Sequence, residues 1–273
     1  GKVAYYLCDW SPERFPNPIM NRIYLFLDRA ACRLSDVAWN INRAIEDGRK
    51  NVLHYDFPMA EQITVPYHVP INMALLRPVE AVDRNAVLFS GAGWNIANGT
   101  HLLPEIARIL MKKKPGVRII ATGSGSGAAE LERKIREYRL DNLELKGFLQ
   151  HDEYERLIYS CAIGLAPFVP TAGSTKAYGD VAKIRTYLGA GLAVVTTPVP
   201  ATAIEISSEK LGLVVEPDPE ALAEAILTLV ENDGLYLQCR RNVIEKVERQ
   251  SMEKILDEAF RKTLEPAESP VNS

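Results

Sequence analysis

The sequence predicts an α/β fold built on a doubly wound parallel sheet. From about residue 85 onward, short apolar runs alternate with amphipathic stretches of helical spacing. The runs are too short for helices, and several are apolar on both faces, as central strands of a parallel sheet are. The composition agrees, because 47% hydrophobic and 25% charged residues are typical of a globular chain with a sizeable core. The six expected strands are residues 86–90, 117–122, 143–146, 162–166, 192–196 and 211–215.

The stretches between these runs carry helical patterns. In the first, apolar residues follow Thr100, a plausible N-cap, at positions i, i+1, i+4, i+7 and i+8. A similar stripe closes the series. Strands that alternate with helices imply right-handed βαβ units. The two stripes are Leu102, Leu103, Ile106, Ile109 and Leu110, and then Leu222, Ala225, Ile226, Leu229 and Val230.

The first 83 residues have a different organisation. Strands are expected at 3–7, 36–40 and 63–66, with a helix over 20–34 and a short helix from Asn42. Three strands and two helices are too few to close an independent layer. This segment is therefore interpreted as the second half of a domain whose first half is absent.

Three parts follow from this organisation. Residues 1–83 form the partial domain and a linker, and residues 84–233 form the complete doubly wound domain. Residues 234–273 comprise a long helix, with an expected break near Ser251, and a polar tail from Glu265 that is expected to be mobile.

Charge and cysteine usage exclude several classes of protein. A net charge of −3 argues against a dedicated nucleic-acid binder. Four widely spaced cysteines without a CxxC pair predict free thiols, and the four scattered histidines predict no metal site. No apolar run approaches the roughly 20 residues of a membrane span, and no signal peptide opens the sequence. A cytoplasmic protein without metal or cofactor is expected.

Five segments of the larger domain carry a family resemblance, in the family's own order. Residues 84–232 resemble the donor-binding half of GT-B fold glycosyltransferases, most of all the large retaining nucleotide-sugar family (family 4, group 1-like). Residues 1–83 are similar to the end of the acceptor domain in such enzymes, and the last helix to the segment that crosses back onto that domain. The five segments are VLFSGAG, VRIIATGSGSGAAEL, NLELKGFLQHDEYERLIYSCAIGLAPF, AKIRTYLGAGLAVVTTPVPATAIEI and LGLVVEPDPEALAEAI.

Small and aromatic residues follow the expected strands, at the sheet edge where ligands of parallel sheets bind. Small residues let the backbone approach a ligand closely. The resemblance implies that the Gly147–Leu149 loop holds the nucleobase, and a simple turn is the equal alternative. Gly123-Ser-Gly-Ser-Gly127 is not a GxGxxG fingerprint, and a tight turn explains Gly123 at least as well as ligand contact. The candidates are Gly91 and Gly93 for a diphosphate, Gly147, Phe148 and Leu149 for the base, and Trp94, Gly123, Gly125 and Phe168 as lining, with packing the alternative for Trp94.

Lys183 is the strongest single candidate. The loop 171–180, rich in Gly, Ser and Thr, leads into a helix expected to begin near Val181. A helix N-terminus suits a diphosphate, whereas a cation there is unfavourable unless an anion compensates it. Thr186 lies three residues later on the same face and is the candidate for a ribose hydroxyl. The alternative is a solvated lysine beside Asp180.

The sequence departs from the family at its charged positions. The two glutamates that the family places eight positions apart correspond to Tyr178, a further lining candidate, and Thr186. The family's basic pair after the first strand is also missing, because residues 90–100 contain no Lys or Arg. Lys183 is left as the main diphosphate ligand, with Arg185 as a weaker one. The chain is then either a divergent, perhaps inverting, member or one of reduced activity, and its catalytic residues stay unknown.

The resemblance implies a hexosyl transfer in polysaccharide biosynthesis. The donor would be a UDP- or GDP-sugar, and the acceptor a glycan, a lipid-linked molecule or a small molecule. The chain alone is expected to bind nucleotide and turn over poorly. Two alternatives stay open, a nucleotide-sugar 2-epimerase and a non-catalytic binding module. Peripheral attachment to the inner face of the plasma membrane through an absent segment also stays open.

Overall fold

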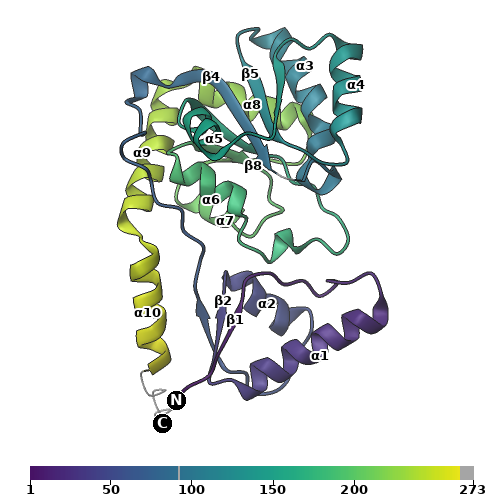
Figure 1. The fold of residues 1–273 in the computed structure, drawn as a ribbon, viewed down its shortest axis with the longest axis vertical. Helices are drawn as coiled ribbons and strands as arrows, with labels where there is room; N and C mark the ends of the chain where they lie inside the picture. Colours follow the sequence, from purple (N-terminus) through teal and green to yellow (C-terminus); the bar gives the residue numbers. More distant parts are fainter. Residues whose placement is uncertain (92, 265–273) are drawn as a thin grey trace. The chain divides into compact units, whose positions relative to one another are not determined.

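The computed structural model describes residues 1–91 and 93–264, and it divides into two compact units (Figure 1). The N-terminal unit comprises residues 1–67, 173–180 and 250 onward. The second, larger unit comprises residues 68–172 and 181–249. The predicted tail, 265–273, lies outside the described residues.

The larger unit is built on a six-stranded parallel sheet, as the sequence predicts. Its strand order is β6-β5-β4-β7-β8-β9, and every neighbouring pair is parallel. The first three strands extend the sheet in one direction and the last three in the other. The strands are β4 (Asp83–Gly91), β5 (Arg118–Gly123), β6 (Leu143–Gly147), β7 (Cys161–Ala166), β8 (Ala193–Thr196) and β9 (Gly212–Val214).

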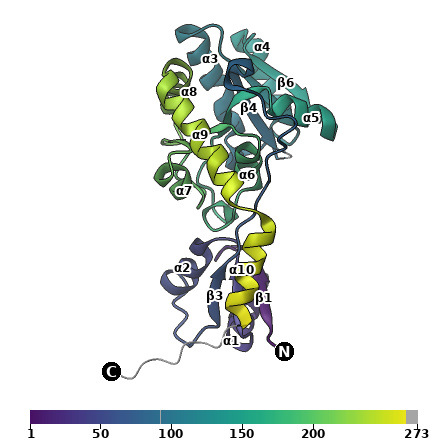
Figure 2. The ribbon, with the colours of Figure 1, turned by 90° about the vertical axis from the view of Figure 1, so that its left-hand side faces the viewer.

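Helices cover both faces of this sheet (Figures 1 and 2). One hydrophobic cluster joins the sheet to α3 (Leu103–Lys113), α4 (Ala128–Tyr138) and α8 (Pro219–Glu231). A second cluster joins it to the helices on the other face. The remaining elements of this unit are α5 (His151–Ile158), α6 (Ala182–Gly189), α7 (Ala203–Ser208), α9 (Asp233–Arg249) and the short turns η1 (Val79–Ala81), η2 (Ile96–Asn98) and η3 (Thr100–Leu102).

The N-terminal unit has the expected three strands, all parallel, in the order β1-β2-β3. Successive side chains of a strand point to opposite faces, and β2 uses both. Trp39 packs edge-on against Phe260 of α10, whereas Asn40 hydrogen-bonds to Arg49 of α2. The elements are β1 (Ala4–Leu7), α1 (Pro18–Leu34), β2 (Val37–Asn40), α2 (Arg43–Asn51), β3 (Glu61–Thr64), η4 (Thr175–Ala177) and α10 (Met252–Leu264).

The two units differ from the predicted boundaries in three places. Residues 68–83 belong to the larger unit and not to the partial domain. Residues 173–180 belong to the N-terminal unit, where the Tyr67 N–H donates to Asp180 Oδ2 at 3.0 Å. The long terminal helix is divided at 250–251, close to the expected break, so that α9 and α10 pack in different units.

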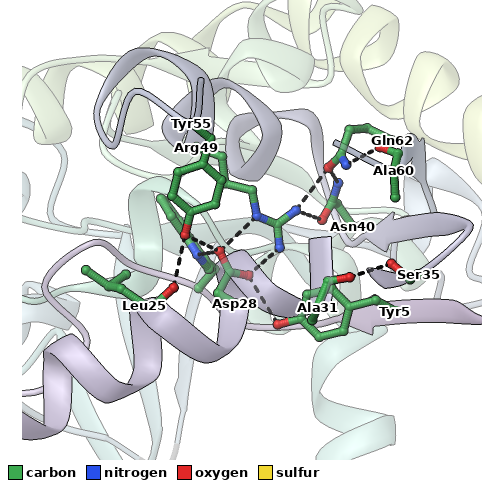
Figure 3. Close-up of polar contacts among 11 residues, drawn as sticks. Tyr5, Leu25, Asp28, Ala31, Ser35, Asn40, Arg49, Tyr55, Ala60 and Gln62 are labelled. Atoms are coloured by element: carbon green, nitrogen blue, oxygen red, sulfur yellow. Dashed lines mark hydrogen bonds and ion pairs between the residues drawn. The ribbon is translucent and has the colours of Figure 1, made fainter. Parts of the chain in front are cut away.

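A buried ion pair lies between α1 and α2 (Figure 3). The side chains of Asp28 and Arg49 are both fully buried, and Arg49 donates to the two carboxylate oxygens at 2.6 and 3.1 Å. The hydroxyls of Tyr5 and Tyr55 and the Trp10 indole N–H also donate to Asp28. The cluster therefore links two helices and a strand, and its two charges compensate each other within the unit.

Removing one partner of this pair leaves the other charge buried, so Arg49→Met should destabilise the N-terminal unit by about 3–5 kcal/mol. Hydrogen–deuterium exchange of the 37–51 backbone measures this loss as a lower opening free energy. Arg29→Met is the matched control, because the Arg29–Asp56 pair is exposed and should contribute less than about 1 kcal/mol. Equal losses in the two variants would refute the structural role of the buried pair.

Candidate functional site

The order of the six-stranded sheet locates the candidate site. The chain leaves β4 in one direction through β5 and β6, and returns beside β4 with β7 before it continues through β8 and β9. Such a reversal opens a crevice at the carboxyl ends of the two central strands, where ligands of doubly wound sheets bind. Here the ends are those of β4, at Gly91, and β7, at Ala166.

Lys183 lies at this reversal point. Its Nζ is 4.2 Å from the ring centroid of Phe89, on β4, and 5.2 Å from that of Phe168, just after β7. Both rings are fully buried, so they form an aromatic floor under the ammonium group. Cation–π contact stabilises such a group by about 0.5–2 kcal/mol and holds it in place. The structure therefore brings together three of the predicted residues, Lys183, Gly91 and Phe168.

The helix that carries Lys183 starts without a side-chain cap. Its N-cap position is Val181, whose side chain has no hydrogen-bonding group, and no acidic residue lies in its first turn. Helix N-termini carry the positive end of the backbone dipole. Lys183 adds a positive charge to that end of the helix.

Two glycines let the ends of β4 and β5 approach each other. Gly123 has φ +112°, and a Cβ added there would lie 1.9 Å from the carbonyl oxygen of Gly91. A Cβ added at Gly91, which has φ +148°, would lie 3.2 Å from Lys183 Cε. Gly123 is therefore required by backbone packing, which supports the turn alternative. Gly91 leaves the space that the lysine side chain occupies.

Trp94, Gly93 and Gly125 form a packed turn behind this edge. Trp94 is only 3% exposed, and its indole N–H donates to the Thr122 carbonyl at 3.2 Å. The Trp94 N–H donates to the carbonyl of Ser124, and a Cβ on Gly125 would lie 2.3 Å from the Trp94 nitrogen. The Gly93 carbonyl accepts from the Asn98 side chain at 2.6 Å. Trp94 is thus a core residue, as its packing alternative states.

The Gly147–Leu149 loop is open. Gly147 ends β6 with φ +63°, and nothing lies within 4 Å of a Cβ placed on it. Phe148 is 79% exposed, which is unusual for a large aromatic side chain, and Leu149 is half-buried. β6 lies two strands from β4, or about 10 Å at ordinary strand spacing. An exposed ring is therefore presented at the same sheet edge as Lys183.

The structure commits Arg185 to other partners. Its guanidinium is buried and pairs with Glu205 at 2.7 Å, and Glu205 also pairs with Lys246 at 2.6 Å. Burial alone would raise the pKa of Glu205, but these two cations outweigh it and hold that pKa below its ordinary value. Arg185 is thus a structural ion-pair residue, and the prediction that it binds the diphosphate is wrong.

The Thr186 hydroxyl donates to the Ala182 carbonyl at 2.9 Å, which leaves the hydroxyl oxygen as an acceptor.

Tyr178 belongs to the N-terminal unit. Its ring packs edge-on against Trp10 at 4.8 Å, and its carbonyl accepts from the Asn42 side chain at 2.7 Å. A Cβ added at Gly48 would lie 2.7 Å from the Tyr178 ring, so the ring fits closely against α2. Its contacts are therefore those of a packing residue.

A separate hollow of about 420 Å³ lies between the start of α3 and α4. Its charged residues are already paired, because Glu105 bonds to Arg108, Glu130 to Arg133, and Lys134 to the Tyr138 hydroxyl. This hollow does not include Lys183 or its aromatic floor, and we do not assign the site there.

Sequence reasoning missed Phe89 because it looks like any core residue of a strand.

In residues 1–91 and 93–264 no group of three or more His, Cys, Asp or Glu side chains is placed to hold a metal ion. Over the same residues, no helix combines the length and apolarity needed to cross a membrane.

Doubly wound sheets bind ligands at such a reversal point, and helix N-termini are frequent sites of phosphate binding. The comparison with known families is specific. Residues 84–232 match the model of the family Glycosyl transferases group 1, and the chain belongs to this family. The match covers residues 84–172 and 181–232 of the larger unit, together with residues 173–180 of the N-terminal unit.

Solved structures of GT-B glycosyltransferases share the fold and confirm the fold predicted from the sequence. Staphylococcus aureus TarM, in complex with fondaparinux, α-GlcNAc-glycerol and UDP, has a TM-score of 0.71 and 17% identity over 96% of this chain and 50% of its own. The pneumococcal O-GlcNAc transferase GtfA, in complex with UDP and GlcNAc, has a TM-score of 0.73 and 14% sequence identity. The match covers 95% of this chain and 51% of the GtfA chain. The chain thus spans about half the length of these two structures. No curated protein matches the sequence.

Gly123→Ala tests the close approach of the two strand ends. The added methyl group meets the Gly91 carbonyl and forces a left-handed φ on alanine, so we expect a loss of about 2–5 kcal/mol in the free energy of unfolding. Urea unfolding followed by tryptophan fluorescence measures it. Gly116→Ala is the control, because its Cβ meets nothing closer than 4.0 Å. A Gly123→Ala protein as stable as the control would contradict the packing.

Proposed function

We propose that the chain is the donor-binding part of a glycosyltransferase, which binds a nucleoside-diphosphate sugar at the carboxyl ends of β4 and β7. The observation that carries the proposal is the position of Lys183, whose ammonium group lies over two buried rings at the sheet reversal. Membership of the glycosyl transferases group 1 family supports it. The TarM and GtfA structures, both in complex with UDP, make UDP the first nucleotide to test.

In this proposal Lys183 neutralises part of the diphosphate charge. The start of α6 adds the positive end of its dipole, and Gly91 keeps the strand end narrow so that phosphate oxygens can come close. Charge on a leaving diphosphate grows as the glycosidic bond breaks, so a cation held here stabilises the transition state more than the ground state.

The nucleoside would extend along the sheet edge toward β6. The strand spacing places the Gly147–Leu149 loop about 10 Å from β4, comparable with the separation of a nucleobase from its diphosphate. Phe148 offers an exposed ring on which a base can stack. Thr186 lies one turn after Lys183 and can accept a hydrogen bond from a ribose hydroxyl.

A second candidate function is nucleotide-sugar binding without transfer. It is favoured by Tyr178 and Thr186, which stand where the family pattern has glutamates, and by the packing of Tyr178 against Trp10. A transfer assay with the radiolabelled donor separates the two functions, because the binding module gives no transfer to any acceptor. Turnover with a glycan or lipid-linked acceptor would exclude the binding module.

Lys183→Ala should weaken UDP binding by about 10–150-fold, because charge-assisted contacts are each worth about 1.5–3 kcal/mol. Isothermal titration calorimetry with UDP, GDP and ADP at one fixed salt concentration measures the effect. Lys112→Ala is the matched control, since Lys112 is an exposed lysine in the last turn of α3. If the wild type binds none of the three nucleotides, the donor site is refuted.

Phe148→Ala tests the nucleobase end of the site. Loss of stacking should reduce the free energy of UDP binding by about 1–3 kcal/mol. Binding of inorganic pyrophosphate should be unaffected, because pyrophosphate has no base. Competition titrations with both ligands measure the difference. Ile204→Ala removes an equally exposed apolar side chain on α7 and should change neither affinity. A parallel loss of UDP and pyrophosphate affinity would contradict stacking on Phe148.

A further inference from the structure

Tyr187 lies on the same helix face as Lys183, four residues later. Its side chain is fully buried, and its hydroxyl contacts both strands of the sheet reversal. The hydroxyl accepts from the Ser90 N–H of β4 at 2.8 Å and donates to the Leu165 carbonyl of β7 at 3.2 Å. One side chain therefore fixes α6 to β4 and β7 at once.

The fit of the Tyr187 ring is specific. It lies against the backbone of Gly164 on β7, where an added Cβ would be 2.3 Å from the ring. Any larger residue at position 164 would displace the ring and with it α6. The Ser90 side chain extends the contact, because its oxygen is 3.3 Å from the Tyr187 hydroxyl and 3.2 Å from the Tyr154 hydroxyl. The hydroxyl position is thus determined from three sides.

These contacts connect directly to the candidate site. Ser90 immediately precedes Gly91, the residue beside the Lys183 side chain. Lys183 and Tyr187 are spaced i and i+4, so they lie on one face of α6. The same hydroxyl therefore sets both the end of the strand and the rotation of the helix that carries the cation.

We infer that Tyr187 is a positioning residue of the diphosphate site, which holds the Lys183 ammonium over the Phe89 and Phe168 rings through α6. The inference rests on the proposed function for its consequence in nucleotide binding. Its structural part, the position of the lysine, is independent of any ligand. The two parts can therefore fail separately.

The chain offers a matched control at the other end of the same helix. The Tyr159 hydroxyl accepts from the Asn72 N–H at 2.6 Å and donates to the Gly189 carbonyl at 3.0 Å. Tyr159 is also buried, and Tyr→Phe at either position removes a hydroxyl that bonds to one backbone N–H and one backbone carbonyl, and leaves the ring in place. The Tyr159 hydroxyl bonds to the last residue of α6, whereas the Tyr187 hydroxyl fixes the helix to β4 and β7. Tyr159→Phe therefore measures the loss of stability from a missing buried hydroxyl while the contacts that position Lys183 stay in place.

The experiment compares Tyr187→Phe and Tyr159→Phe by NMR and by calorimetry with UDP. Protons above an aromatic ring shift upfield, so the ε-methylene protons of Lys183 report its position over Phe89. In Tyr187→Phe we expect this upfield shift to fall, the Ser90 amide to exchange faster, and the Kd for UDP to rise about fivefold. In Tyr159→Phe all three should stay at wild-type values.

An unchanged lysine shift in Tyr187→Phe, or an equal change in both variants, would overturn the positioning role. A wild type that binds none of UDP, GDP and ADP, with the lysine shift altered only in Tyr187→Phe, would refute the donor site and leave the positioning role supported. Urea unfolding of both variants establishes that each is compared as a folded protein.

Discussion

The candidate site depends on the position of one cation that opposes the dipole of its own helix. A lysine in the first turn of a helix opposes the backbone dipole, and the structure keeps Lys183 there by placing two buried rings beneath it. The residues around Lys183 are compatible with this position of its side chain. Gly91 leaves room for the side chain, Gly123 lets the adjacent strand end close against Gly91, and an aliphatic residue takes the N-cap position. In the proposed function, an anion bound at this helix start would relieve the unfavourable dipole interaction.

The N-terminal unit is held together in a different way, because a three-stranded layer has little apolar surface to bury. The Asp28–Arg49 pair links α1 and α2, and tyrosine and tryptophan donors satisfy the remaining carboxylate lone pairs. A buried pair of this kind contributes little net stability compared with apolar packing, but it leaves few alternative arrangements of the two helices. We interpret it as a device that specifies one packing of a thin layer, and therefore not as a catalytic dyad.

Periodicity was enough to predict the six strands of the larger unit and the helices α3 and α8, because most of these strands are apolar and both helices carry regular apolar stripes. The strand order was not readable in the same way, and the aromatic floor depends on it, since Phe89 and Phe168 meet Lys183 only when β4 and β7 are adjacent. The glycines were ambiguous for a physical reason, because ligand approach and backbone approach both require a missing side chain. Tyr178 was chosen from its position in the family pattern, and that pattern gave no sign that residues 173–180 fold with the N-terminal unit.

The charges at the site set limits on its chemistry. The family pattern has a basic pair after the first strand of this unit and two glutamates near α6, whereas this chain has Lys183 alone of the predicted cations, since Arg185 is bound to Glu205. A diphosphate with one ammonium partner and a helix dipole is held less tightly than one with a cationic cluster. The binding energy available to stabilise a leaving diphosphate is reduced in proportion. If the proposed function holds, the residues around Lys183 would bind and orient the donor, and the acid–base chemistry of transfer would have to come from groups outside this set.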